Sequence, residues 1–332
     1  MNRSSRIGPF LMALFVACSC PATTRAAADQ REGTTRVVAD WKERRSRLPN
    51  AIRLELEGTV TVFRGSSPDS NPPFPPEDHT FPTRSMLLID FQRNRHRVET
   101  SADEAWRVAP KRGFRRIDMV RLYDGKSFQR FYPRAAEQRS GKKSDPGRDL
   151  ELLTGEAGFG RCMCAFFEGG YPFLSMLPGK LTRQPLVVTD QLRDAMRSPG
   201  TATLDGHSYT LLRSPRDRYG RWGELYVDSS RQSAIRRRTE FDADGHEMMR
   251  LDITGYRLVD GLWLPAEWSL SESKSGRPLR KEQEKVTGLD LAPRLSDDLF
   301  HIEPSAGMVV HDEVTGKTFT VQGRPEEEIG KP

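Results

Sequence analysis

His246 to Arg250 (HEMMR) begins like the His-Glu-x-x-His motif of zinc proteases. In that motif two histidines, four residues apart on one helical face, bind Zn²⁺ while the glutamate acts as general base. Here Arg250 stands in the place of the second histidine, and the segment follows a turn, so we expect a strand. The sequence predicts no metal site at this position.

Two further segments resemble parts of ligand-binding loops. Asp242 to Gly245 (DADG) resembles the start of a calcium loop, but the remaining ligands, including the glutamate at the twelfth position, are missing. A turn is the expected structure there. Gly155 to Cys162 (GEAGFGRC) is rich in glycine but lacks the Gly-Lys-Ser/Thr ending of a phosphate-binding loop. We expect a flexible connection or hinge.

The sequence offers no recognisable set of catalytic residues. It contains no Gly-x-Ser-x-Gly nucleophile motif. The histidines are scattered, with no pair at ligand spacing: His79, His96, His207, His246, His301 and His311. The sequence therefore predicts no enzyme activity and no cofactor.

The first 28 residues have the pattern of an export signal. Arg3 and Arg6 precede an apolar stretch, 7–17, which is shorter than the roughly 20 residues that a membrane-spanning helix needs. The alanines at 26–28 provide a cleavage site that would leave Asp29 as the mature N-terminus. We predict an exported protein, in the periplasm or on the periplasmic face of the outer membrane.

Cys18 raises a second possibility for the same segment. Bacterial lipoprotein signals resemble Leu-Ala-Gly-Cys, and here Ala17 fits this pattern while Phe15 fits it poorly. Lipidation of Cys18, cleavage before Asp29 and a retained uncleaved anchor all stay open.

The mature chain has moderate charge and two cysteines. Removing 1–28, which holds three arginines and no acid, lowers the formal net charge from +6 to +3. This value does not indicate nucleic-acid binding. Cys162 and Cys164 are separated by one residue, so unpaired thiols, a strained disulfide and metal or redox use are all open.

Hydrophobic periodicity predicts a helix followed mainly by strands. Residues 34–48 read as an amphipathic helix. Val37, Val38, Trp41 and Leu48 fall on one side, and most of Lys42, Arg44, Arg45 and Arg47 fall on the other. Residues 52–62 alternate as a long strand, and the proline-rich residues 64–83 are expected to form an exposed loop or insertion.

The rest of the chain predicts hairpins with one interruption. Hairpins are expected at 85–99 and, with a turn at Asp124–Gly125, at 115–132. Residues 150–200 suggest short helices, for example 166–177 and 189–197. Further strands are predicted at 207–213, 222–228, 234–241, 247–258, 262–272 and 279–291.

The fold class is therefore α+β, with one mainly antiparallel sheet in a single domain over 29–322 and a tail at 323–332. The arginines at 236–238 should alternate between the two faces of their strand.

Three segments together resemble the outer-membrane lipoprotein carrier and sorting family, the LolA/LolB-like group. Residues 120–133 (VRLYDGKSFQRFYP) resemble its "DG…YxP" hairpin, and 256–270 (YRLVDGLWLPAEWSL) resemble a later hairpin. Residues 295–321 resemble the C-terminal segment of larger members, in which a phenylalanine strand leads to Pro-x-x-Gly. The greater length, the insertion at 64–83 and the cysteine region depart from the typical carrier.

The resemblance implies a strongly bent antiparallel half-barrel closed by a few helices, with an apolar cavity for acyl chains of a lipid or lipoprotein. It implies transport or sorting at the cell envelope, without catalysis, by a monomer that can associate with the membrane peripherally or through a lipid anchor. The residues expected to line the cavity are Ile52, Leu54, Leu56, Val60, Val62, Leu225, Val227, Leu251, Ile253, Leu262 and Leu264. The residues expected in a lid are Phe166, Phe167, Phe173 and Leu177.

Two other functions are compatible with the same pattern. Periodicity cannot distinguish a cavity from a filled core, so an envelope structural or interaction protein remains an alternative. An exported hydrolase without a recognisable local motif is the other.

Overall fold

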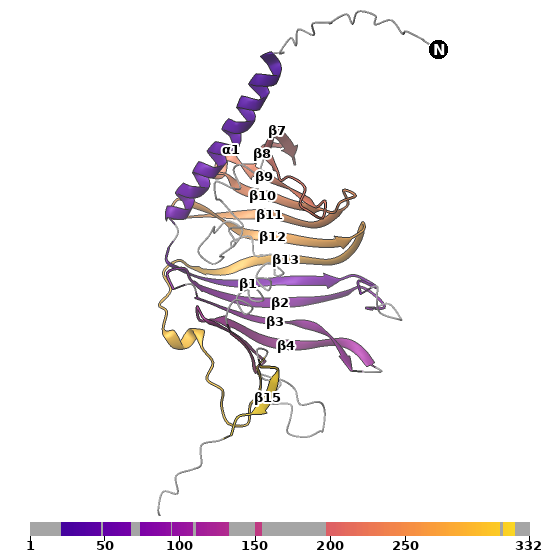
Figure 1. Cartoon of the computed structure of the whole chain (residues 1–332), viewed down its shortest axis with the longest axis vertical. Coiled ribbons are helices and arrows are strands. Elements are labelled where there is room, and N and C mark those ends of the chain that lie inside the picture. The colour runs from indigo at the N-terminus through magenta and orange to yellow at the C-terminus, as the bar shows by residue number, and fades with distance from the viewer. Residues whose placement is uncertain are drawn as a thin grey trace, which may run out of the picture.

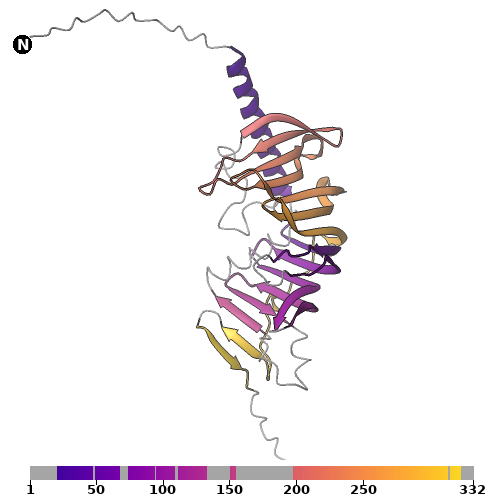
Figure 2. The ribbon, with the colours of Figure 1, turned by 90° about the vertical axis from the view of Figure 1, so that its right-hand side faces the viewer.

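The computed structural model describes residues 21–47, 49–67, 74–93, 95–108, 111–132, 150–154, 197–312 and 315–322. Their strands form one 15-stranded sheet, in the order β15-β14-β6-β5-β4-β3-β2-β1-β13-β12-β11-β10-β9-β8-β7. All pairs are antiparallel except β14 with β6. The sheet is not closed, because β15 and β7 are its two edge strands. Figure 1 shows the strands stacked in this order, and Figure 2 shows the twist of the sheet.

The N-terminal half contributes one helix and six strands. Their bounds are α1 (Pro21–Arg47), β1 (Ala51–Val62), β2 (His79–Asp90), β3 (Arg95–Val108), β4 (Lys111–Tyr123), β5 (Ser127–Phe131) and β6 (Leu150–Thr154). The C-terminal half contributes the remaining strands and two short 3₁₀ helices. Their bounds are β7 (Arg197–Leu204), β8 (His207–Arg213), β9 (Trp222–Asp228), η2 (Ser229–Arg231), β10 (Ala234–Phe241), β11 (Glu247–Val259), β12 (Leu262–Lys274), β13 (Arg277–Asp290), η3 (Asp297–Phe300), β14 (Val309–Asp312) and β15 (Lys317–Thr320).

The mainly antiparallel sheet with few helices confirms the predicted class. The alternation predicted over 52–62 is seen in β1, where Ile52, Leu54 and Leu56 are buried while Arg53 and Glu55 are exposed. The half-barrel shape and its closure by helices stay predictions.

Several predicted boundaries were wrong. Helix α1 begins at Pro21, well before residue 34, and so crosses the predicted cleavage site. Strand β2 begins at His79, so the end of the proline-rich segment 64–83 is a strand, in which Phe81 is buried. Strands β6 and β7 lie at the two ends of 150–200, and β7 begins at Arg197, the residue at which the second expected helix was to end. The rest of the helices expected at 166–177 and 189–197 lies outside the described residues.

Helix α1 is anchored beside the strands of the C-terminal half (Figure 1). The indole Nε1 of Trp41 donates to the Ser233 carbonyl over 2.6 Å, and the Ser233 hydroxyl donates to the Asp40 carboxylate. Arg44 is buried, contrary to the predicted polar side, and donates to the Trp263 carbonyl over 2.5 Å. Burial lowers the pKa of Arg44 to about 10. Backbone carbonyls of the sheet thus replace water around this guanidinium.

The arginines at 236–238 do not alternate as predicted. A β-bulge lies between Ile235 and Arg237 in the pairing of β10 with β9. A bulge places an extra residue in one strand, which breaks the period of two. Arg236 and Arg237 therefore reach the same carboxylate, that of Asp252, over 3.3 and 2.6 Å.

The C-terminal segment is attached to β2, β3 and β5. Arg95 is buried and contacts the carboxylates of Asp90 at 2.8 Å and Asp297 at 2.6 Å, with its guanidinium 4.4 Å from the centre of the Phe300 ring. The Gln129 side chain exchanges two hydrogen bonds with the Ile302 backbone. Phe300 lies in η3, so the phenylalanine strand expected there was wrong.

Gly58 allows β1 and β13 to approach closely. A Cβ atom at this position would lie 2.2 Å from the Gln283 carbonyl oxygen. Because that oxygen belongs to the backbone, a side chain would force the two central strands apart. We expect Gly58→Ala to lower the free energy of unfolding by about 2 kcal/mol or more. Urea denaturation measures this, with Thr59→Ala, at an exposed position of the same strand, as the contrast. An unchanged midpoint for Gly58→Ala would contradict the close approach.

Candidate functional site

The apolar face of the sheet is a candidate binding surface. A single buried cluster crosses nine neighbouring strands, from β5 through β1 to β10. We call it the apolar face. Its members are Ile52, Leu54, Leu56, Leu87, Ile89, Phe91, Val98, Tyr123, Phe128, Ile235, Leu251, Ile253, Leu262, Leu264, Trp268, Leu270 and Val286. Cross-strand register explains its continuity, because Leu54 pairs with Leu87 on one side and with Leu289 on the other.

Most residues predicted to line a cavity belong to this cluster. They are Ile52, Leu54, Leu56, Leu251, Ile253, Leu262 and Leu264. Val60 is also buried and Val62 is half-buried, although neither belongs to the cluster. Their role in ligand binding stays a prediction.

The two predicted lining residues from β9 lie next to the helix. Val227 is buried with Val37 of α1 and Leu212 of β8 in a second, smaller cluster. Leu225 is half-buried and contacts both clusters. Packing under α1 therefore accounts for the burial of Val227.

Two glutamates interrupt the apolar face, and the sequence prediction missed both. Glu282 and Glu284 of β13 are 2% and 9% exposed. Glu284 pairs across the strands with Gly58 of β1 and Trp268 of β12. The surrounding sequence, KEQEKV, looks like a solvated strand. Their burial could have been predicted from their spacing to Val286. Residues 282, 284 and 286 are two apart along one strand, so their side chains point to the same face.

Burial is the largest influence on the pKa of these two carboxyl groups. It raises the pKa of Glu284 to about 8, with a further rise from the neighbouring Glu282 and opposing effects from Arg280 and the Thr83 hydroxyl. Burial also raises the pKa of Glu282, which Arg280 opposes through an ion pair. At neutral pH, Glu284 is therefore mainly an uncharged acid.

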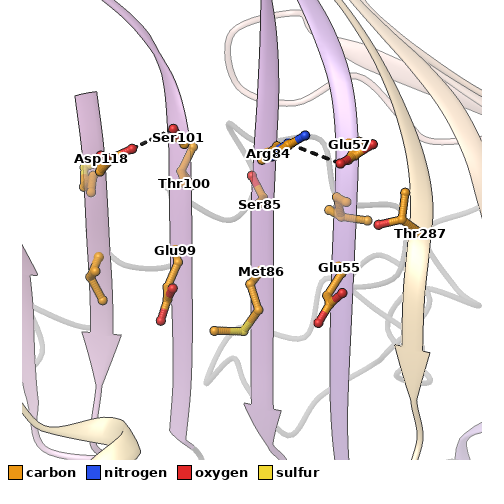
Figure 3. A pocket seen from close by; sticks show the side chains of 13 residues that line it. Glu55, Glu57, Arg84, Ser85, Met86, Glu99, Thr100, Ser101, Asp118 and Thr287 are labelled. Carbon is orange, nitrogen blue, oxygen red and sulfur yellow. Dashed lines mark hydrogen bonds and ion pairs between the residues drawn. The ribbon is translucent and has the colours of Figure 1, made fainter. Parts of the chain in front are cut away.

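The opposite face carries an open hollow of about 380 Å³ over β1 to β4 (Figure 3). In Figure 3 the side chains of Glu55, Met86 and Glu99 lie side by side on three neighbouring strands. Arg84 contacts Glu57 at 3.2 Å in the same view.

Charges in this hollow are paired with neighbours. Glu55 contacts Arg53 at 2.7 Å, and Glu99 contacts Arg97 at 2.6 Å. The Ser101 hydroxyl donates to Asp118 over 2.6 Å. Exposed pairs of this kind contribute little stability and are typical of a solvated sheet surface. The apolar face is therefore the stronger candidate site.

The turn at 242–246 brings three potential metal ligands together. One atom each from Asp242, Asp244 and His246 lie within 4.8 Å of one another. The Asp242 carboxylate accepts hydrogen bonds from the backbone N–H groups of Asp244 and His246 over 3.0 and 2.8 Å. These bonds are those of an aspartate-stabilised turn, as the sequence predicted.

Several predicted features lie outside the described residues. They are Cys18, Cys162, Cys164 and the lid residues Phe166, Phe167, Phe173 and Leu177. Within the described ranges, no helix combines the length and the apolar character needed to cross a membrane.

Comparison with known proteins gives matches among solved structures. No protein-family model matches the sequence, and no curated protein sequence matches it. A LolA superfamily protein from Nitrosomonas europaea is 13% identical with a TM-score of 0.42, over 81% of this chain and 97% of that chain. A DUF1329 family protein from Desulfovibrio piger is 10% identical with a TM-score of 0.38, over 81% and 96%. A Vibrio parahaemolyticus domain assigned to outer-membrane lipoprotein sorting is 11% identical with a TM-score of 0.40, over 82% and 97%. These matches include the group that the sequence motifs resemble.

Proposed function

We propose that this protein is exported and binds acyl chains of a lipid or lipoprotein on its apolar face, for transport or sorting at the cell envelope. The observation that carries the proposal is the continuity of the apolar face across nine neighbouring strands. Each CH₂ group removed from water on such a surface contributes about 0.8 kcal/mol, so an acyl chain needs no further recognition to bind. The hairpin motifs at 120–133 and 256–270 support the same proposal by resemblance.

Protein purified from its native envelope provides the direct test. Mass spectrometry of an organic extract should find a stoichiometric lipid or acylated peptide, and the mass of the intact chain should show whether Cys18 carries an anchor. A lipid-free extract from folded protein that also fails to bind added fatty acid would contradict the proposal.

Truncation of a central leucine separates a binding surface from a filled core. We expect Leu54→Ala to weaken binding of a fluorescent fatty acid about fivefold or more, because three buried carbon atoms leave the surface that the acyl chain contacts. Fluorescence titration at matched concentrations of folded protein measures this effect.

Leu212→Ala is the matched control, because Leu212 is equally buried but lies in the cluster under α1. We expect it to lose about 2–4 kcal/mol of stability with unchanged affinity per folded molecule. If Leu54→Ala behaves in the same way as Leu212→Ala, the apolar face is a filled core.

A further inference from the structure

Two polar groups of opposite hydrogen-bonding type lie unpaired and side by side on the apolar face. Trp268 is 2% exposed, and its indole Nε1 has no hydrogen-bond partner among the described residues. Within the same ranges, Oε2 of Glu284 has none either. The two residues are direct cross-strand partners, so their Cβ atoms are about 5 Å apart and their side chains leave the sheet on one face.

Unpaired polar groups are costly in such a place. Leaving a buried donor or acceptor without a partner costs the desolvation of that group, and native structures have few of them. A donor and an acceptor on cross-strand partners of one face form a pattern which one ligand group can satisfy. This is an independent indication of a ligand, beyond the presence of acidic side chains.

The surroundings determine the charge that this ligand group can carry. Glu282 has its counterion in Arg280, whose side chain is 40% exposed. Glu284 has no ion-pair partner among the described residues, and burial holds it mainly in its protonated form at neutral pH. The pattern is therefore a neutral acid beside an indole N–H.

The strand directions also give the ligand an orientation. Along β13 the same face changes from Arg280, through Glu282 and Glu284, to the buried Val286. On β1, the positions from Gly58 to Ile52 continue as an apolar row of about 20 Å. Polar and apolar parts of one amphiphile would match this gradient.

We infer that Glu284 and Trp268 bind the uncharged head group of an amphiphile, a hydroxyl or an amide that both donates and accepts a hydrogen bond, while its acyl chain lies on the apolar face. Trp268 donates to the oxygen of this group, and Glu284 accepts from its O–H or N–H. The inference rests on the proposed function, because the same surface holds the chain.

Three probes of equal chain length test the head group: decanol, decanoate and decylammonium. Each is titrated by calorimetry into the full chain at pH 7, below its critical micelle concentration or, for decanol, below its solubility limit. We expect decanol to bind at least about tenfold more tightly than decanoate, because an anion beside Glu282 and Glu284 is repelled and desolvated.

Variants of Glu284 distinguish a neutral hydrogen-bonding site from a cation site. Glutamine keeps an uncharged donor and acceptor, so Glu284→Gln should retain decanol binding. Glu284→Leu and Trp268→Phe should each weaken it about three- to tenfold, the effect of one lost hydrogen bond. Glu57→Gln, on the opposite face, is the control for surface charge and should change nothing. Circular dichroism checks that each variant is folded, and Trp268→Phe tests the same site independently of Glu284.

The outcomes separate this inference from the proposed function. If decylammonium binds more tightly than decanol and Glu284→Gln abolishes the difference, the site binds cations and the inference is wrong. If all three probes bind equally, the chain is bound without head-group recognition, and only the inference fails. If none of them binds, the proposed function fails and the inference fails with it.

Discussion

Replacing Arg95 with methionine should lower the free energy of unfolding by about 3–5 kcal/mol, the largest effect we expect from a single substitution. Arg95 is only 7% exposed, and Asp90 beside it is 5% exposed. Without the guanidinium, the Asp90 carboxylate would stay buried with its main counterion removed. Burial lowers the pKa of Arg95, but hydrogen bonds to Asp90 and Asp297 outweigh this effect and raise it. The guanidinium therefore stays charged at every pH at which the protein is studied.

Arg93 provides a matched control for this prediction. It contacts the same Asp297 carboxylate at 2.7 Å, but its side chain is 60% exposed. Arg93→Met should therefore change the free energy of unfolding by less than about 1 kcal/mol in urea denaturation. Combining Arg95→Met with Asp90→Asn should recover part of the loss, because no buried charge then remains unpaired. Equal losses for Arg93→Met and Arg95→Met would show that burial of the pair is unimportant.

The stability of the wild-type protein should fall relative to Glu284→Gln as the pH rises from 5 to 8.5. A free glutamate has a pKa of about 4.3, whereas that of Glu284 is about 8. Between these values the folded state keeps a proton that the unfolded state releases, so a rise in pH favours unfolding. The stability linked to this group is fully present below about pH 4 and is lost as the pH rises through about 8.

The difference between wild type and Glu284→Gln should grow by about 4 kcal/mol between pH 5 and pH 8.5. Denaturation in urea at a series of pH values measures it. Comparison with a variant is needed because Glu282, whose pKa is also raised by burial, titrates on the same face. The Glu57 side chain is 54% exposed, so the free energy of unfolding of Glu57→Gln should depend on pH in the same way as that of the wild type. Parallel curves for Glu284→Gln would mean that Glu284 is ionised in the folded protein.

Local sequence determined the strands and their turns. The period of two in residues 52–62 places Ile52, Leu54 and Leu56 on one face because successive side chains of a strand point in opposite directions. The turn at Asp124 was predictable because its carboxylate accepts hydrogen bonds from the backbone of Lys126 and Ser127, both over 2.7 Å. The class of the sheet follows from many such local signals in series.

The tertiary structure alone decided which strands are neighbours and what they bury. Strand β1 lies beside β13, more than 200 residues away, and this pairing places Glu284 between Gly58 and Trp268. Local periodicity fixes the phase of a strand but not its partner, so KEQEKV reads as solvated although two of its glutamates are buried. Arg44 was misplaced for the same reason, because the carbonyl groups that accept its hydrogen bonds belong to Gln232 and Trp263, which are 188 and 219 residues away in the chain. The apolar face could be predicted from its residue types, but its polar interruption depends on long-range register.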